Sequence, residues 1–261
     1  MGGPRWEVHR LEEREAIGAI LARDPVYGAY ALGDLDPRFF PQAEWAAAYL
    51  DGEPVALTHL YRGLSPHPLE TFGDVRGLAL ILGTAQRAPE ACFNCLEEHL
   101  PAVEGFYALG PKKRMWRMVV RAGWFRPVEG PAERLGMADL GDLEELYATG
   151  DAESFTPDLL EQGVFYGVRV LGRLVAAAGT HLVSDVQRVA AVGNVYVHPR
   201  YRGQGLGTVV TSRVTEELLG RGLLVVLDVE EGNAPALRVY EKLGYERHCA
   251  FVECLGRRKA A

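Results

Sequence analysis

The residues best suited to chemistry lie in one glycine-rich segment, Arg202-Gly-Gln-Gly-Leu-Gly207, followed by Thr208. Alternate positions carry the glycines: Gly203, Gly205 and Gly207. The segment opens an amphipathic helix whose buried face repeats every four residues: Leu206, Val210, Val214 and Leu218. Glycines leave the N–H groups of the first turn unobstructed, and the positive helix end attracts anions. The segment therefore predicts binding of a diphosphate, with Arg202 adding positive charge at the rim.

Two other phosphate-binding motifs fit this segment less well. A P-loop requires Gly-Lys-Ser or Gly-Lys-Thr, and neither tripeptide occurs in the chain. A dinucleotide fingerprint requires glycine or alanine where Thr208 and Val210 stand. A nucleotide-dependent enzyme that uses the loop in another way stays open as an alternative function.

The segment resembles a known pyrophosphate loop. Arg202 to Gly207 is similar to the R/Q-x-x-G-x-G/A loop of the GCN5-related N-acetyltransferase (GNAT) superfamily, and Val195-Tyr-Val-His-Pro199 is similar to that family's fourth strand. Downstream, Asn233-Ala-Pro-Ala-Leu-Arg-Val-Tyr240-Glu-Lys-Leu-Gly244-Tyr245 resembles the family's N-x-x-A-x-x-x-Y-x-x-x-G-F segment. The resemblance covers about residues 133–253. It extends to the FR47-like and glycine N-acyltransferase-like branch, in which a degenerate N-terminal GNAT-like half precedes the working one.

The resemblance implies an N-acetyltransferase that transfers an acyl group from acetyl-CoA to a primary amine by direct attack. Tyr240 would be the general acid that protonates the leaving thiolate, although its place on an apolar stripe also fits a core aromatic. Asn233 also fits a helix N-cap. The resemblance assigns the following residues to acetyl-CoA: Val195, Tyr196, Val197, Arg202, Gly203, Gln204, Gly205, Leu206, Gly207, Thr208 and Asn233.

The general base is not identified by the resemblance. Many family members carry a glutamate on the fourth strand, where this chain has Ala190-Ala-Val-Gly193. His181, Asp185, Glu230 and a water chain are the candidates by position, and none is preferred. The missing glutamate keeps a second function open, a non-catalytic acyl-CoA-binding sensor or regulatory module.

The elements that position these residues are predicted in two similar series. In the second half we expect a helix at 140–147, a hairpin at 164–171 and 174–181, a strand at 190–197, a helix at 205–219, a strand at 223–229, a helix at 234–243 and a strand at 249–255. In the first half we expect a helix at 11–23, a hairpin at 45–50 and 55–61, strands at 75–82 and 114–120, and a helix at 91–100. Pro127, Gly130 and Pro131 predict a linker.

This order predicts an α/β (α+β) fold in two halves of similar element order. The resemblance implies that these are tandem GNAT-like halves, with a degenerate N-terminal domain at 1–126 and an acetyl-CoA-binding domain at 133–261. The resemblance adds the sheet: mixed, mostly antiparallel and twisted, with splayed parallel central strands flanked by helices. Cys92 and Cys95 fall on the apolar stripe of the helix expected at 91–100, so we expect core packing and no metal site.

The composition limits the partners. Apolar residues make up 48% of the 261 residues and charged residues 24%, which excludes a disordered chain. The net charge of −7 disfavours nucleic acid and anionic membranes, and no apolar stretch approaches the roughly 20 residues of a membrane span. Four cysteines and no secretory signal favour the cytoplasm. The expected partners are a small-molecule or peptide amine acceptor and, in a homodimer, a second copy of the chain.

Overall fold

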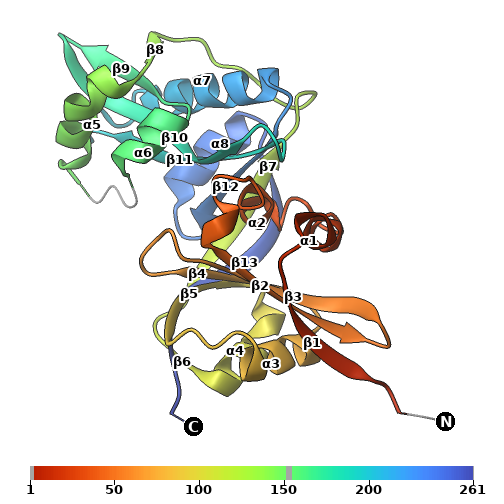
Figure 1. Cartoon of the computed structure of the whole chain (residues 1–261). Helices are drawn as coiled ribbons and strands as arrows, with labels where there is room; N and C mark the ends of the chain where they lie inside the picture. Colours follow the sequence, from red (N-terminus) through yellow and green to blue (C-terminus); the bar gives the residue numbers. More distant parts are fainter. Residues whose placement is uncertain (1–2, 151–154, 261) are drawn as a thin grey trace. The chain divides into compact units, whose positions relative to one another are not determined.

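The chain divides into two compact units (Figure 1). The computed structural model describes residues 3–150 and 155–260. The N-terminal unit comprises Met1–Trp116 together with Cys249–Ala261, and the C-terminal unit comprises Arg117–His248. The last strand of the chain therefore belongs to the N-terminal unit. The tandem domains expected at 1–126 and 133–261 stay a prediction, and the compact units do not follow those boundaries.

The N-terminal unit has helices on both faces of a mixed sheet. Its elements are β1 (Trp6–Leu11), α1 (Arg14–Leu21), α2 (Ala29–Gly33), β2 (Ala43–Leu50), β3 (Glu53–Tyr61), β4 (Pro68–Gly73), α3 (Val75–Thr84), β5 (Glu90–Cys95), α4 (Leu100–Phe106), β6 (Tyr107–Leu109) and most of β13 (Glu246–Arg258). The strand order is β1-β2-β3-β4-β5-β13, in which the β4–β5 pair is parallel. Because side chains alternate along a strand, Trp45 and Ala47 of β2 pack with α1 and α2, while Ala46 and Ala48 pack with α3 and α4.

Two expected elements of this unit are wrong. The strand expected at 75–82 is helix α3, in which Asp74 caps the start and Leu78, Ile81 and Leu82 form a buried face at helical spacing. The helix expected at 91–100 begins as strand β5, because β4 and β13 pair with it on either side. Its buried residues, Ala91, Phe93 and Cys95, alternate with a period of two. Cys92 and Cys95 therefore lie on a strand, where burial raises the pKa of the Cys92 thiol to about 11 and that of Cys95 to about 12.

The C-terminal unit repeats the same strand plan. Its elements are β7 (Lys113–Val120), β8 (Ala132–Arg134), α5 (Leu140–Tyr147), α6 (Pro157–Gln162), β9 (Tyr166–Val170), β10 (Arg173–Ser184), β11 (Val189–Val197), α7 (Leu206–Gly220), β12 (Leu224–Glu230) and α8 (Ala234–Lys242). The strand order is β8-β9-β10-β11-β12-β7. The pairs from β8 to β11 are antiparallel, and β11 is parallel to β12. The expected mixed, mostly antiparallel sheet with parallel central strands is confirmed.

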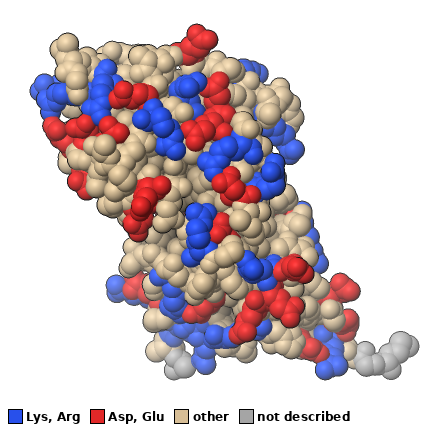
Figure 2. All heavy atoms as spheres, turned by 45° about the horizontal axis from the view of Figure 1, so that its top comes forward, with Lys and Arg blue, Asp and Glu red and all other residues tan. Residues whose placement is uncertain are grey.

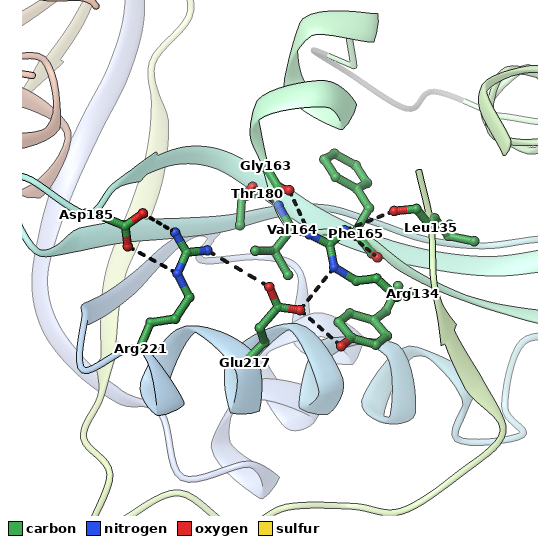
Figure 3. Close-up of polar contacts among 10 residues, drawn as sticks. Arg134, Leu135, Gly163, Val164, Phe165, Thr180, Asp185, Glu217 and Arg221 are labelled. Carbon is green, nitrogen blue, oxygen red and sulfur yellow. Dashed lines mark hydrogen bonds and ion pairs between the residues drawn. The ribbon is translucent and has the colours of Figure 1, made fainter. Parts of the chain in front are cut away.

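Helix α7 is fixed to the sheet by a polar network at its C-terminal half (Figure 3). Glu217 accepts hydrogen bonds from Arg134 Nε and from the Tyr166 hydroxyl, each at 3.0 Å. Arg221, one turn further on, forms an ion pair with Asp185 beyond the end of β10. These contacts join α7 to β8, β9 and the end of β10, while its apolar face packs on β10 and β11. The start of the helix, which carries the glycine loop, is thereby held in place by contacts made elsewhere.

The surface in view carries charges of both signs. Figure 2 shows Lys and Arg side chains interspersed with Asp and Glu rather than gathered into a patch of one sign. Many of these charges form exposed ion pairs, such as Arg62–Glu44 at 2.5 Å and Arg247–Glu241 at 2.7 Å. Among the described residues, no helix is both long enough and apolar enough to span a membrane.

Candidate functional site

Strands β11 and β12 separate after a short stretch of parallel pairing. The pairing runs from Val189–Leu224 to Val192–Leu227, although β11 continues to Val197 and β12 to Glu230. Backbone N–H and C=O groups that leave a sheet need other partners. The residues expected to contact the cofactor through their backbones, Val195 to Val197, follow the point of separation. The structure therefore has an opening between two parallel strands where the resemblance placed one.

A bulge in β11 begins just beyond this point. Between the pairs Ala177–Tyr196 and Gly179–Gly193, β11 has one residue more than β10. Asn194 in the bulge has a φ of +52°, and its carbonyl oxygen accepts a hydrogen bond of 2.7 Å from the Tyr147 hydroxyl of α5. Because a bulge bends its strand, it accounts for the end of the pairing with β12. The sequence reasoning missed both the bulge and Tyr147.

The glycine loop lies between β11 and α7 with its backbone open. Gly203 and Gly205 have φ values of +76° and +80°. Apart from chain neighbours, no atom of the described residues lies within 4 Å of the position where a Cβ would stand on either. Gly205 caps α7, so the N–H groups that follow it in the first turn have no acceptor within the helix. The helix is 15 residues long and brings a positive dipole end to the loop. This arrangement can donate several hydrogen bonds to an anion.

The loop and the end of β11 are joined by Arg202. Its Nε donates a hydrogen bond of 3.1 Å to the Val197 carbonyl oxygen, and its guanidinium lies 5.8 Å from the centre of the Tyr196 ring. The Tyr196 hydroxyl shares a hydrogen bond of 3.1 Å with Thr149. Arg202 is exposed and remains available to a bound anion, while Thr208 is buried within α7.

Helix α8 places the other predicted residues. The Asn233 side chain accepts a hydrogen bond of 3.2 Å from the Ala236 N–H, so it caps the helix as expected. Tyr240 is 7% exposed and packs edge to face against Tyr245, with ring centres 5.9 Å apart. Burial raises the pKa of Tyr240 to about 12. The phenol therefore keeps its proton at neutral pH and can donate it, while the contact of Asn233 with a cofactor stays a prediction.

The three candidate bases lie in different places. Asp185 forms an ion pair with Arg221 next to the β10–β11 turn, away from the separation of β11 and β12. Glu230 is the exposed last residue of β12. His181 lies against Gly193, because a Cβ built on Gly193 would stand 2.3 Å from the His181 Nε2 atom. Of the three, His181 is at the head of the opening.

A buried ion pair next to the opening escaped the sequence reasoning. Asp228 is the first residue of β12 beyond the pairing with β11, and it accepts two hydrogen bonds of 2.9 Å from Arg117 of β7. Arg117 is 1% exposed. In the sequence, Asp228 directly follows the apolar run 223–227. Because a buried carboxylate needs a cationic or hydrogen-bonding partner, this position is the signal that predicts one.

Comparison with known proteins finds a family model and relatives that match this part of the chain. Residues 135–245 match the model of the acetyltransferase (GNAT) family. A mycothiol acetyltransferase from Thermomonospora curvata is 39% identical over 114 residues, which cover 42% of this chain and 35% of that protein. A [ribosomal protein bS18]-alanine N-acetyltransferase from Escherichia coli K12 is 32% identical over 103 residues, or 39% of this chain and 62% of that protein. The matches thus span less than two thirds of either relative.

A solved structure resembles the whole chain in fold. It is a tandem GNAT protein from the clavulanic acid biosynthesis pathway, 14% identical, with a TM-score of 0.56 over 98% of this chain and 100% of that one. At this identity the similarity concerns the fold, and it extends to both compact units.

Proposed function

We propose, on the premise that residues 135–245 belong to the GNAT acetyltransferase family, that the protein transfers the acetyl group of acetyl-CoA to a primary amine. The observation that carries the proposal is the end of the β11–β12 pairing at Val192–Leu227, on the strand that leads into the glycine loop of α7. An opening with unpaired backbone groups suits an extended amide-containing arm, and a helix start with free N–H groups suits a diphosphate.

The residues present fit acetyl-CoA. Gly203 and Gly205 form a cradle that a Cβ would fill, and Arg202 stands at its edge with an exposed guanidinium. Val195, Tyr196 and Val197 would meet the pantetheine arm along β11, and Asn233 would meet it from the start of α8. Gln204, Leu206, Gly207 and Thr208 would contribute the remaining backbone of the loop and first turn.

Tyr240 is proposed as the general acid. The bound thioester supplies an electrophilic carbonyl carbon and a thiolate leaving group. A phenol that burial keeps protonated can donate its proton to that sulfur as the C–S bond breaks. The amine attacks the carbonyl carbon directly, so no covalent enzyme intermediate is required.

The N-terminal unit is proposed to have no cofactor site of its own. Helix α3 follows β4 as α7 follows β11, but the connection is a short turn and the Asp74 carboxylate accepts a hydrogen bond of 2.8 Å from the Gly77 N–H. A carboxylate at the helix start occupies the place an anion would take and repels one. This supports the degenerate half that the resemblance implies.

The acceptor is proposed to be a primary amine of a small molecule or a peptide. One relative is named for mycothiol and another for an alanine of a ribosomal protein. Both kinds of acceptor therefore belong in a screen.

The first experiment is thermal unfolding with acetyl-CoA, CoA, NADH or ATP, followed by an amine screen for thiol release. A ligand at 100 times its dissociation constant adds about 2.7 kcal/mol to the native state, which shifts the Tm measurably. We expect stabilisation by acetyl-CoA and CoA, and thiol release with one class of amine. Stabilisation by NADH or ATP alone would contradict the cofactor, and binding without thiol release would indicate the acyl-CoA sensor.

A further inference from the structure

We propose that His181 is the proton acceptor for the amine in this reaction, the role for which the family's strand glutamate is missing. The inference rests on the proposed function. An amine is mostly an ammonium ion near neutral pH and must lose a proton before its nitrogen can attack. The structure gives three independent reasons for assigning that step to His181: its place in the sheet, the space made for it and its charge state.

A second bulge directs the His181 side chain. The pairs Thr180–Val192 and Leu182–Ala191 leave His181 as one extra residue of β10. Bulges turn a side chain out of the regular alternation and are frequent next to active sites. This bulge lies opposite Val192, the last residue of β11 that pairs with β12. The imidazole is thus brought to the residue at which the opening begins.

Gly193 makes the space for this imidazole. Ring atoms of His181 lie 2.3 to 2.5 Å from the position of a Cβ on Gly193, a separation that real Cβ atoms do not show. A glutamate on β11 at this position is therefore incompatible with the present place of His181. The histidine fills the volume that a side chain on the fourth strand would take, and it does so from the neighbouring strand.

Asn194, the residue after Gly193 on β11, makes a further contact with β10. The Asn194 side-chain amide contacts the Thr180 carbonyl oxygen at 3.4 Å, so it links the two bulges. Its Oδ1 atom is buried and accepts no hydrogen bond from the described residues. The side chain of Asn194 thus lies against β10 at Thr180, the residue before His181.

The surroundings keep the imidazole neutral. Burial lowers the pKa of His181, and the negative charge of Asp228 on β12 opposes this in part. Arg117 on β7 neutralises much of that charge through its two hydrogen bonds to Asp228. Gly193 and Asn194, the neighbours on β11, carry no charge. A neutral imidazole at pH 7 is the form that accepts a proton.

The His181 imidazole takes one proton from the ammonium, and the freed lone pair forms the C–N bond at the thioester carbonyl. The tetrahedral intermediate collapses, the C–S bond breaks, and the sulfur takes a proton from Tyr240. The new nitrogen loses its second proton, which restores the Tyr240 phenol, and the proton on His181 passes to water. The products are the amide, CoA as a thiol and one released proton.

The test compares His181→Gln, Gly193→Ala and the double variant in the full chain with the best amine from the screen. A methyl on residue 193 must displace the imidazole without removing it. The control is His9→Gln, the same change at an exposed histidine of β1. For each protein we would measure kcat/KM from about pH 5.5 to 9.5, and the Tm with and without CoA.

We expect His181→Gln to lower kcat/KM at pH 7 about 10²-fold, within the range for general base catalysis. In this variant kcat/KM should rise tenfold per pH unit toward the pKa of the amine, because only free amine reacts. In the unaltered protein kcat/KM should become constant above a pH that lies below the usual pKa range of histidine, because burial lowers the pKa of His181. Gly193→Ala should lose activity similarly, and the double variant should lose no more than His181→Gln.

Two results would overturn the assignment without touching the proposed function: a His181→Gln profile parallel to that of the unaltered protein, or additive losses in the double variant. The CoA-induced Tm shift should persist in all variants, and its loss in His181→Gln would show a structural role instead. If the unaltered protein releases no thiol with any amine, the proposed function fails and this assignment fails with it.

Discussion

Two buried histidines illustrate how surroundings set the charge of the same side chain. His59 of β3 is 1% exposed and lies 3.3 Å from both an Asp34 oxygen and a Glu70 oxygen. Burial acts to lower its pKa, but the hydrogen bonds and charges of these carboxylates outweigh it and raise the pKa to about 9. His181 has the opposite shift, because burial outweighs the opposing charge of Asp228. At neutral pH one imidazole is cationic and the other is neutral.

The cation at His59 makes a pH-dependent contribution to stability. Its pKa is raised from 6.5 to about 9 in the folded protein, so the contribution is complete below pH 6.5 and is lost as the pH rises through about 9. His59→Gln leaves two carboxylates without their cation and should lower the free energy of unfolding at pH 7 by about 3 kcal/mol. Denaturant unfolding from about pH 6 to 10 measures this. His9→Gln should behave as the unaltered protein, and parallel curves for His59→Gln and the unaltered protein would refute the effect.

Tyr240 offers a test of the general acid. Tyr240→Phe keeps the packing against Tyr245 and removes the proton donor, so kcat should fall about 10²-fold while CoA binding is kept. The matched control is Tyr245→Phe, whose hydroxyl shares a hydrogen bond of 2.8 Å with Thr215 in the core. The control should lose about 1 kcal/mol of stability and keep its kcat. Steady-state thiol release and thermal unfolding distinguish the two, and equal kcat for Tyr240→Phe and the unaltered protein would leave Tyr240 a core residue.

At the scale of elements, the proposed function depends on a helix whose two ends have different tasks. The C-terminal half of α7 is held by Glu217 and Arg221, whereas its start carries open backbone. Rigid anchoring of the far end keeps the N–H groups of the first turn directed at one place. The same helix therefore supplies both the anchor and the proposed anion site.

Glycine-to-alanine changes at the two ends of α7 separate these tasks. Gly205 has a φ of +80° and open space at its Cβ position. Gly205→Ala strains the present loop conformation by roughly 1–2 kcal/mol and puts a methyl into the proposed cradle, so it should weaken CoA binding at least tenfold. Gly220, the last residue of α7, has open space at its Cβ position. Gly220→Ala should leave CoA binding unchanged. Calorimetric titration with CoA measures both, and equal dissociation constants for the two variants would remove the loop from the binding site.

The sequence predicted the local backbone features of the candidate site better than the N-terminal elements. The glycine loop and the Asn233 cap depend on local residue types, and both are present as expected. Segments 75–82 and 91–100 were assigned wrongly, because short apolar runs do not distinguish a buried helix from a buried strand. The bulges at His181 and Asn194 follow from register between strands. The Arg117–Asp228 pair joins residues 111 positions apart, and a single sequence does not report such a contact.

At the scale of the molecule, the two units share one strand plan. β1 to β5 correspond in order to β8 to β12, and each series ends in a parallel pair. Apart from the short β6, the strand that comes next in the chain after each series pairs with the last strand of the other series. β7, which follows β5, borders β12, while residues 249–258 of β13, which follows β12, complete the sheet beside β5.

This plan predicts the behaviour of fragments. A fragment of residues 133–261 lacks Arg117 and so leaves the Asp228 carboxylate, 19% exposed, without its cation, at a cost of about 3–5 kcal/mol. A fragment of residues 1–126 lacks the strand beside β5. We expect neither to unfold cooperatively alone, and we expect the two to associate when coexpressed. Circular dichroism on denaturation and gel filtration measure this, and two independently stable fragments would contradict it.

The position of β13 also determines when the N-terminal unit can complete its folding during translation. Most domains at the N-terminal end of a chain can fold while the remainder is still being made on the ribosome. Here β5 can pair with residues 249–258 only after they have been made, and they are translated more than 150 codons later. The N-terminal unit therefore finishes its sheet after every residue of the glycine loop has been added. Slow translation of the last third of the message would prolong the time for which that edge stays unpaired, and with it the exposure of the chain to aggregation and to chaperones.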